Sequence, residues 1–198
     1  MRIIGGQKKG KKLQSPKGME TRPTSDKMRA AMFNILQHAT WADFLHPHFE
    51  NTVIFDAFAG SGALSLEALS RGAQFATMIE QDRSAIQTCK SNITLCNMEE
   101  RHKIIPRDAT KIGPRPTDVP AANLIFLDPP YGHNLGIKAL DTAIKKGWIA
   151  DQAVVLLEMD KKRLENLDKI AGIEKIDSRD YGASRLDFYL YHVNKLAA

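Results

Sequence analysis

Short apolar runs alternate with amphipathic stretches from residue 52 onward. Runs at residues 52–55, 75–79, 103–105, 124–127 and 153–157 have the length and composition of buried strands. Between them, residues 63–71, 82–97 and 137–147 carry apolar side chains at helical spacing. Leu164, Leu167 and Ile170 predict one more helix. This alternation predicts a doubly wound α/β fold with a mostly parallel sheet.

The two ends of the chain have other patterns. Residues 2–13 predict a short hairpin or extended arm with glycine turns, and residues 28–36 carry the stripe of an amphipathic helix behind the capping residues Ser25 and Asp26. Residues 41–49 are expected to form a helical or irregular connector, which Pro47 interrupts. Residues 173–177 and 186–193 alternate with period two and predict an antiparallel pair at a sheet edge, and hence a reversed final strand.

Composition narrows the class of protein. The chain has 198 residues, of which 43% are hydrophobic and 26% charged, values typical of a globular protein. No run approaches the roughly 20 apolar residues of a membrane helix, and the first residues do not resemble a signal peptide. Cys89 and Cys96 lie on one face of a predicted helix and are expected to be reduced core thiols. We therefore expect a cytoplasmic protein without a metal site.

The first four predicted strands are followed by acids at the same edge of the sheet: Asp56, Glu80, Asp108 and Asp128. A glycine loop follows the first strand, where close backbone approach and free N–H groups at a helix start favour a ligand. The dinucleotide pattern would need a third glycine where Ser65 stands, and a P-loop would need a lysine. These departures disfavour pyrophosphate binding. The acid after the second strand, Glu80, can bind the hydroxyls of a ribose.

The residues after the fourth strand are Asp128, Pro129, Pro130 and Tyr131. The prolines end the strand, because they cannot donate to a sheet ladder. A carboxylate, a fixed carbonyl and an aromatic ring together suit a planar base that carries an amine. Asp128 and a proline carbonyl can accept its two hydrogens, and Tyr131 can stack on its ring.

The pattern D-x-F-x-G-x-G at residues 56–62 resembles motif I of S-adenosylmethionine-dependent methyltransferases. Over nearly the whole chain, the sequence resembles the RsmD family of bacterial 16S rRNA guanine-N2 methyltransferases. The resemblance rests on residues 2–6 (RIIGG), 21–26 (TRPTSD), 33–36 (FNIL), 58–62 (FAGSG), 67–73 (EALSRGA) and 128–131 (DPPY), and more weakly on residues 181–182 (YG). The family more often has Leu at the position of Ala57, a minor departure.

The resemblance implies a Rossmann-like class I methyltransferase domain over residues 51–198, with a seven-stranded sheet and an antiparallel C-terminal strand. Residues 1–50 would form a small N-terminal extension that contacts RNA. It implies methyl transfer from S-adenosylmethionine to guanine N2, with 16S rRNA or the small ribosomal subunit as partner; we expect a monomer. The implied catalytic residues are Asp128, Pro129, Pro130 and Tyr131. The implied cofactor-binding residues are Asp56, Phe58, Ala59, Gly60, Ser61, Gly62, Glu80, Gln81, Asp108, Ala109 and Asp128.

The net charge of +5 is unevenly distributed, because the first seventeen residues contain six basic residues and no acid. A basic cluster of this kind is typical of a surface that binds a phosphate backbone, although it also suits a solvated terminus. The residues expected to contact RNA are Arg2, Lys8, Lys9, Lys11, Lys12, Arg22, Thr24 and Arg29.

Three alternatives remain open. A DNA amino-methyltransferase acting on adenine N6 or cytosine N4 shares the Asp-Pro-Pro-Tyr turn, but usually carries a separate target-recognition domain. An RNA-binding protein of the same fold without activity would not need Gly60, Gly62, Glu80 and Asp128. A nicotinamide oxidoreductase is disfavoured by Ser65 and by the proline turn.

Overall fold

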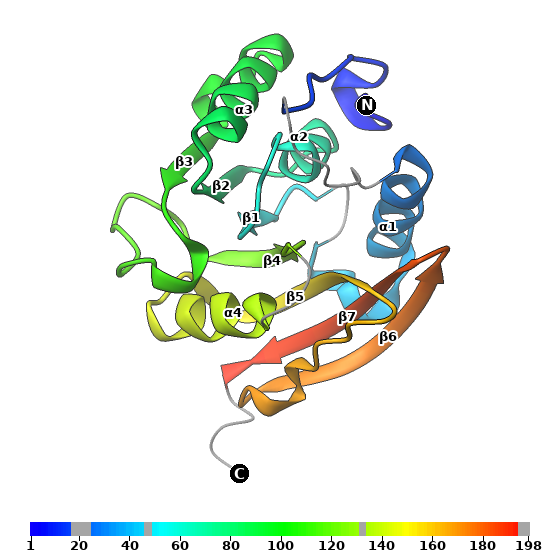
Figure 1. Cartoon of the computed structure of the whole chain (residues 1–198), viewed down its shortest axis with the longest axis vertical. Helices are drawn as coiled ribbons and strands as arrows, with labels where there is room; N and C mark the ends of the chain where they lie inside the picture. The colour runs from blue at the N-terminus through cyan, green and yellow to red at the C-terminus, as the bar shows by residue number, and fades with distance from the viewer. Residues whose placement is uncertain (17–24, 46–48, 131–133, 194–198) are drawn as a thin grey trace.

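The computed structural model describes residues 1–16, 25–45, 49–130 and 134–193. Figure 1 shows one twisted sheet with helices packed against it. In chain order, the elements within these residues are η1 (Gly6–Lys8), α1 (Asp26–His38), η2 (Thr40–Leu45), β1 (Val53–Asp56), α2 (Ala63–Ser70), β2 (Phe75–Glu80), α3 (Arg83–Cys96), η3 (Glu99–Arg101), β3 (His102–Pro106), η4 (Ala109–Lys111), β4 (Ala122–Leu127), α4 (Leu135–Lys145), β5 (Ile149–Asp160), η5 (Leu167–Lys169), β6 (Ile173–Tyr181) and β7 (Ser184–His192).

The sheet has seven strands in the order β3-β2-β1-β4-β5-β7-β6. The first five strands in sequence pair in parallel, and β7 is antiparallel to both of its neighbours, β5 and β6. The predicted mostly parallel seven-stranded sheet with a reversed final strand is therefore confirmed. The antiparallel pair expected at a sheet edge is also confirmed, with β6 outermost and β7 between β5 and β6. Strand β5 is also longer than the predicted run, since it begins at Ile149.

Alternate residues of each strand point to two separate cores. On one face, Ile54, Leu124 and Phe126 pack with the buried sides of α1, α2 and α3. On the other face, Phe55 and Ile125 pack with α4 and η5. Right-handed crossovers place α2 and α3 on one face of the sheet and α4 on the other. The reason is that the chain moves outward in opposite directions from β1 and from β4. The place where the direction reverses lies between these two central strands.

The N-terminal segment folds back on itself as a small hairpin and packs beside α2 (Figure 1). Arg2 and Lys12 form an antiparallel bridge, and the side chains of Ile3 and Leu13 are buried in the same core as α1 and α2. This segment, residues 1–16, is called the arm below. The hairpin expected from the glycine turns is thus confirmed, and its apolar residues join the core of the domain.

The predicted helix over residues 164–170 is wrong. The structure has only the short 3-10 turn η5 there, Leu164 is 55% exposed, and Glu165 is buried instead. A regular helix would have kept Leu164 on the inward stripe with Leu167. The chain instead turns Glu165 inward because its carboxylate accepts a hydrogen bond from the start of α4, as described below.

Candidate active site

The carboxyl ends of β1 and β4 meet at the reversal point of the sheet. Ligands of open α/β folds bind in the crevice at this position, because the loops leave the two strands in opposite directions. Asp56 ends β1, and its Cα partner across the β1–β4 ladder is Phe126. Asp128 follows directly after β4, two residues beyond Phe126. The structure therefore brings Asp56 and Asp128 to neighbouring strand ends, as the sequence predicts.

Asp56 is buried, with only 1% of its surface exposed. Its Oδ2 atom accepts a 2.8 Å hydrogen bond from the Ser65 hydroxyl, while its Oδ1 atom has no partner of good geometry among the described residues. Burial raises the pKa of Asp56 to about 7, the Ser65 hydrogen bond opposes this rise, and the negative charge of Glu80 adds to it. Asp56 is thus a buried acid with an unused acceptor atom at the reversal point.

The glycine loop is held between the two strands on either side of β1. The Ala57 N–H donates to the Phe126 carbonyl at 3.1 Å, and the Ala59 N–H donates to the Ile79 carbonyl at 3.0 Å. Gly60 and Gly62 have φ of 53° and 78°, values that disfavour other residues. A Cβ on Gly62 would lie 2.8 Å from the Cys89 sulfur, whereas a Cβ on Gly60 would meet open space. Gly62 is therefore needed for packing, and Gly60 leaves its face of the loop open.

Glu80 holds the glycine loop and the start of α3 together. Its Oε2 atom accepts the Gly60 N–H at 2.8 Å, and its Oε1 atom accepts the N–H groups of Gln81 and Asp82 at 2.8 and 2.9 Å. Asp82 in turn caps α3 through the Ala85 N–H. A carboxylate has about four acceptor positions. Three of these positions accept the hydrogen bonds above. The half-buried Glu80 carboxylate therefore has one acceptor position left, on Oε2, where a ligand could donate.

Asp108 and Ala109 follow β3 at the same edge. The Oδ1 atom of Asp108 accepts from the backbone N–H and the hydroxyl of Thr110, at 2.9 and 2.7 Å, and its Oδ2 atom lies 3.7 Å from the Lys111 ammonium. Partial burial acts to raise the pKa of Asp108, but the Thr110 hydrogen bonds and the Lys111 charge outweigh it and lower the pKa. Ala109 is 3% exposed. Asp108 is thus an ionised acceptor, fixed in orientation.

The turn after β4 begins with half-buried Asp128, buried Pro129 and exposed Pro130. Tyr131, predicted to stack on a base, lies outside the described residues. Asn134 precedes the next helix, α4, and its side chain does not cap that helix. The acceptor comes from Glu165 instead, whose Oε2 atom takes the Ile137 N–H at 3.1 Å. Glu165 thus holds the first turn of α4.

The N-terminal arm is bonded to the C-terminal half of α2. Buried Glu67 accepts the N–H groups of Ile4 and Gly5, at 2.7 and 2.8 Å, and its Oε1 atom pairs with Arg71 at 2.7 Å. The Ser70 hydroxyl donates to the Gly5 carbonyl at 2.7 Å. Two sequence stretches that support the family resemblance, residues 2–6 and 67–73, therefore contact each other directly.

The arm is also tied to the glycine loop, through Asn92 of α3. The Asn92 side chain is fully buried; its amide nitrogen donates to the carbonyls of Ser61 and Gln14, at 2.9 and 3.0 Å, and its oxygen accepts the Gln14 N–H at 2.8 Å. The arm is therefore fixed relative to the loop.

The residues expected to contact RNA divide into four groups, the last of which is Arg29. Lys9, Lys11 and Lys12 are exposed on the arm, and Lys8 is half-buried beside them. The Arg2 side chain is 67% exposed and lies 3.4 Å from Asp26. Arg22 and Thr24 lie outside the described residues.

The prediction that Arg29 contacts RNA is wrong for this structure. Arg29 is 1% exposed, and its guanidinium donates to the Arg2 carbonyl at 2.7 Å and to Asp26 at 2.8 Å. Burial lowers the pKa of Arg29, and the Asp26 charge opposes that change. Arg29 therefore joins α1 to the arm, a role in which its side chain cannot reach a phosphate.

Sequence reasoning missed Glu67, Asn92 and Glu165. A signal existed for the first two, since Glu67 lies one turn after inward-facing Leu64, and Asn92 lies between Cys89 and Cys96 on the inward stripe of α3. A polar residue on an inward stripe must find a hydrogen-bond partner. No local pattern marked Glu165, because its partner lies 28 positions away in the chain.

The described residues contain neither a metal centre nor a membrane-spanning helix. Among the described residues, no group of His, Cys, Asp and Glu side chains is arranged to hold a metal ion. In the same part of the chain, no helix is long and apolar enough to cross a membrane.

Comparisons with known proteins agree over nearly the whole chain. The family model described as Conserved hypothetical protein 95 matches residues 1–190. Ribosomal RNA small subunit methyltransferase D of Escherichia coli K12 is 34% identical over 160 residues, which cover 81% of this chain and 75% of that protein. YlbH of Bacillus subtilis is 31% identical over 193 residues, covering 96% and 98%. The solved structure of yhhF from Escherichia coli superposes with a TM-score of 0.77 at 29% identity and covers 98% of both chains.

Proposed function

The chain belongs to the Conserved hypothetical protein 95 family, which is the RsmD family, and on this premise we propose that it methylates the exocyclic N2 amine of a guanine in 16S rRNA. The methyl donor would be S-adenosylmethionine, and the substrate the small ribosomal subunit or a precursor of it in the cytoplasm. The observation that carries this proposal is the position of Asp128 and Pro129. They leave β4 at the reversal point of the sheet, beside a glycine loop with a buried acid.

The residues at the strand ends fit S-adenosylmethionine. The Oδ1 atom of Asp56 would serve as an acceptor toward the cofactor, and the open face of Gly60 leaves room for it. The remaining acceptor position of Glu80 suits a ribose hydroxyl, and Asp108 offers a carboxylate to an adenine amine. Six residues next to these acids in the chain would complete the cofactor site: Phe58, Ala59, Ser61, Gly62, Gln81 and Ala109.

S-adenosylmethionine supplies a methyl group on a sulfonium, which is electrophilic without further activation. The difficulty lies with the acceptor, because the lone pair of an aryl amine is conjugated into the ring. Asp128 and the Pro129 carbonyl would accept the two N–H bonds of the guanine amine and direct its lone pair out of the ring plane. The rigid turn orients these acceptors before the base arrives, so the acceleration comes from proximity and electrostatic preorganisation.

The base must leave its own stack to enter this site. Within the proposal, Tyr131 stacks on the extruded guanine and Pro130 forms the exposed rim of the turn. Arg2, Lys8, Lys9, Lys11 and Lys12 would hold phosphates of the surrounding RNA, which gives affinity without reading sequence. Residues 1–50 would thus serve as the RNA-contacting part, and residues 51–198 as the catalytic part of a monomeric enzyme.

The test is transfer of labelled methyl from S-adenosylmethionine to three substrates: naked 16S rRNA, small subunits lacking the modification, and duplex DNA. We expect label in N2-methylguanine of rRNA, with subunits preferred over naked RNA. Label only in DNA would replace the proposal with a DNA amino-methyltransferase. Bound cofactor without transfer to any of the three would favour an RNA-binding protein that has lost activity.

A further inference from the structure

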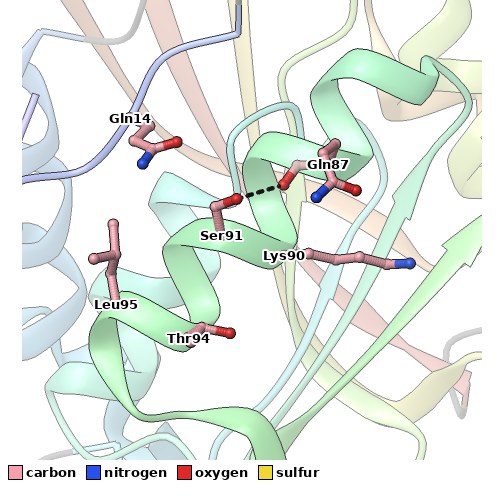
Figure 2. Close-up of a pocket in the computed structure, with 6 residues that line it drawn as sticks. All are labelled: Gln14, Gln87, Lys90, Ser91, Thr94 and Leu95. Atoms are coloured by element: carbon pink, nitrogen blue, oxygen red, sulfur yellow. Dashed lines mark hydrogen bonds between the residues drawn. The ribbon is translucent and has the colours of Figure 1, made fainter.

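A groove opens between the arm and the outer face of α3, apart from the strand ends. Its volume is about 370 Å³, and it is lined by Gln14, Gln87, Lys90, Ser91, Thr94 and Leu95. Figure 2 shows Gln14 on the arm, with Ser91 and Leu95 across the opening, and Lys90 and Thr94 on adjacent turns of α3. Neither the glycine loop nor the Asp128 turn contributes a side chain to this lining.

The two walls of the groove are held at a fixed separation. Asn92 lies beneath them, accepts the Gln14 N–H at 2.8 Å and donates to the Gln14 carbonyl at 3.0 Å. Within α3, the Ser91 hydroxyl donates to the Gln87 carbonyl at 3.1 Å. Because Asn92 is fully buried, the groove exists before any ligand binds, and binding would cost little ordering of the backbone.

The electrostatic character of the groove is positive. Neither wall carries an acid, since residues 1–16 and 83–98 contain no Asp or Glu. Within the described part of the chain, Lys8, Lys9, Lys11, Lys12 and Lys90 form no ion pair with a carboxylate. An anionic ligand would therefore meet unpaired ammonium groups.

The positive charge of the arm extends to the C-terminal end of α3. Burial raises the pKa of the Cys96 thiol, and the charges of Lys11 and Lys8 oppose that rise. The other groove residues offer what a sugar–phosphate chain needs, because amides and hydroxyls hydrogen-bond phosphate and ribose oxygens. Leu95, 37% exposed, adds an apolar contact for a sugar.

We propose that this groove binds the phosphate backbone of the RNA substrate and is a second RNA contact, continuous with the basic arm. The inference rests on the proposed function, since it takes the substrate to be rRNA. The amide of Asn92 that fixes the groove also holds the Ser61 carbonyl at 2.9 Å. RNA seated in the groove is therefore joined to the glycine loop through one buried side chain.

The first test reverses one charge. Lys90→Glu should raise the dissociation constant for the RNA substrate, the one that accepts the methyl group, about fivefold. It should also reduce the slope of log affinity against log salt by about 1. Cofactor affinity should not change. The matched control is Lys169→Glu, an exposed lysine in η5, which packs on the opposite face of the sheet. Equal affinities and equal salt slopes for the two variants would overturn the inference.

The second test locates the RNA directly. Cys89 and Cys96 are free and buried, as the sequence predicts, so a maleimide photo-cross-linker will label an introduced exposed thiol. Labelled Thr94→Cys, bound to small subunits, should cross-link to 16S rRNA, and labelled Lys169→Cys should not. Cross-links from Thr94→Cys to ribosomal protein alone would refute an RNA groove. If wild-type protein transfers no methyl to rRNA, the proposed function itself fails, whereas active Lys90→Glu with wild-type affinity removes only the groove.

Discussion

Replacing Glu67 with alanine should destabilise the protein severely, although Glu67 belongs neither to the proposed cofactor site nor to the proposed RNA contacts. Its fully buried carboxylate accepts two backbone N–H groups of the arm and pairs with Arg71. Removing one partner of a buried pair costs about 3–5 kcal/mol. Arg71 keeps its hydrogen bond to Gln37 and its contact with the Phe33 ring, which favours the lower end of that range. The two amides lose an acceptor, at about 1 kcal/mol or more in total.

The sum is about 4 kcal/mol, a large part of the roughly 5–15 kcal/mol that stabilises a domain. Urea unfolding followed by circular dichroism would measure it. Glu100→Ala, which removes an exposed acid from η3, is the control and should change the free energy of unfolding by less than about 0.5 kcal/mol. Glu67→Gln should lose about half as much as Glu67→Ala, because one oxygen remains while its NH₂ group faces a donor.

A local measurement separates this explanation from general destabilisation. Under native conditions, the Ile4 and Gly5 amides should exchange with solvent much faster in Glu67→Gln than in wild type, and amides of β4 should change far less. The reasoning would be refuted if Glu67→Ala cost under about 1 kcal/mol, or if the Ile4 and Gly5 amides kept their wild-type protection.

Three further predictions concern the strand ends and the start of α4. Asp128→Ala should lower methyl transfer by at least about 100-fold and leave cofactor affinity nearly unchanged, and lost cofactor affinity would contradict this division of roles. Because the folded-state pKa of Asp56 is raised to about 7 from an ordinary value of 3.8, the folded protein binds this proton more tightly than the unfolded chain does. Wild-type stability should therefore fall as pH rises from about 4 to 7, by up to about 1.4 kcal/mol per unit, and Asp56→Asn should remove that slope in urea unfolding curves. Glu165→Ala should cost about 1–3 kcal/mol and speed amide exchange at Ile137, whereas Glu165→Gln should restore much of both.

The sequence alone was sufficient for the parts of the molecule that depend on local periodicity. The five parallel strands, the acids at their ends and the helices between them follow from apolar runs of the right length and from glycine or proline at their ends. The position of Asp56 beside Asp128 also follows, because parallel strands in this connectivity share a carboxyl edge. The sequence is therefore enough to place the candidate site at that edge.

What the sequence could not supply are contacts between residues far apart in the chain. Arg29 is a charged residue of the kind usually found on the surface. Its hydrogen bonds to the Arg2 carbonyl and to Asp26 instead hold it buried between α1 and the arm. Residues 164–170 have helical spacing, yet the need for an acceptor at the start of α4 turns Glu165 inward. In both cases the partner lies on another element, and no window of local sequence contains the pair.

The order of the last strands has a consequence for the growing chain. Strand β6 pairs only with β7 among the described strands, and β7 is also the sole neighbour of β5 on that side. As the polypeptide is synthesised, β6 leaves the ribosome before the strand that it needs, and the edge of β5 remains open meanwhile. The strand that completes the sheet, β7, is therefore the last to be synthesised and inserts between β5 and β6. A chain cut before residue 184 would lose two strands from the sheet, because β6 would have no partner. It would leave the long apolar edge of β5 exposed to aggregation.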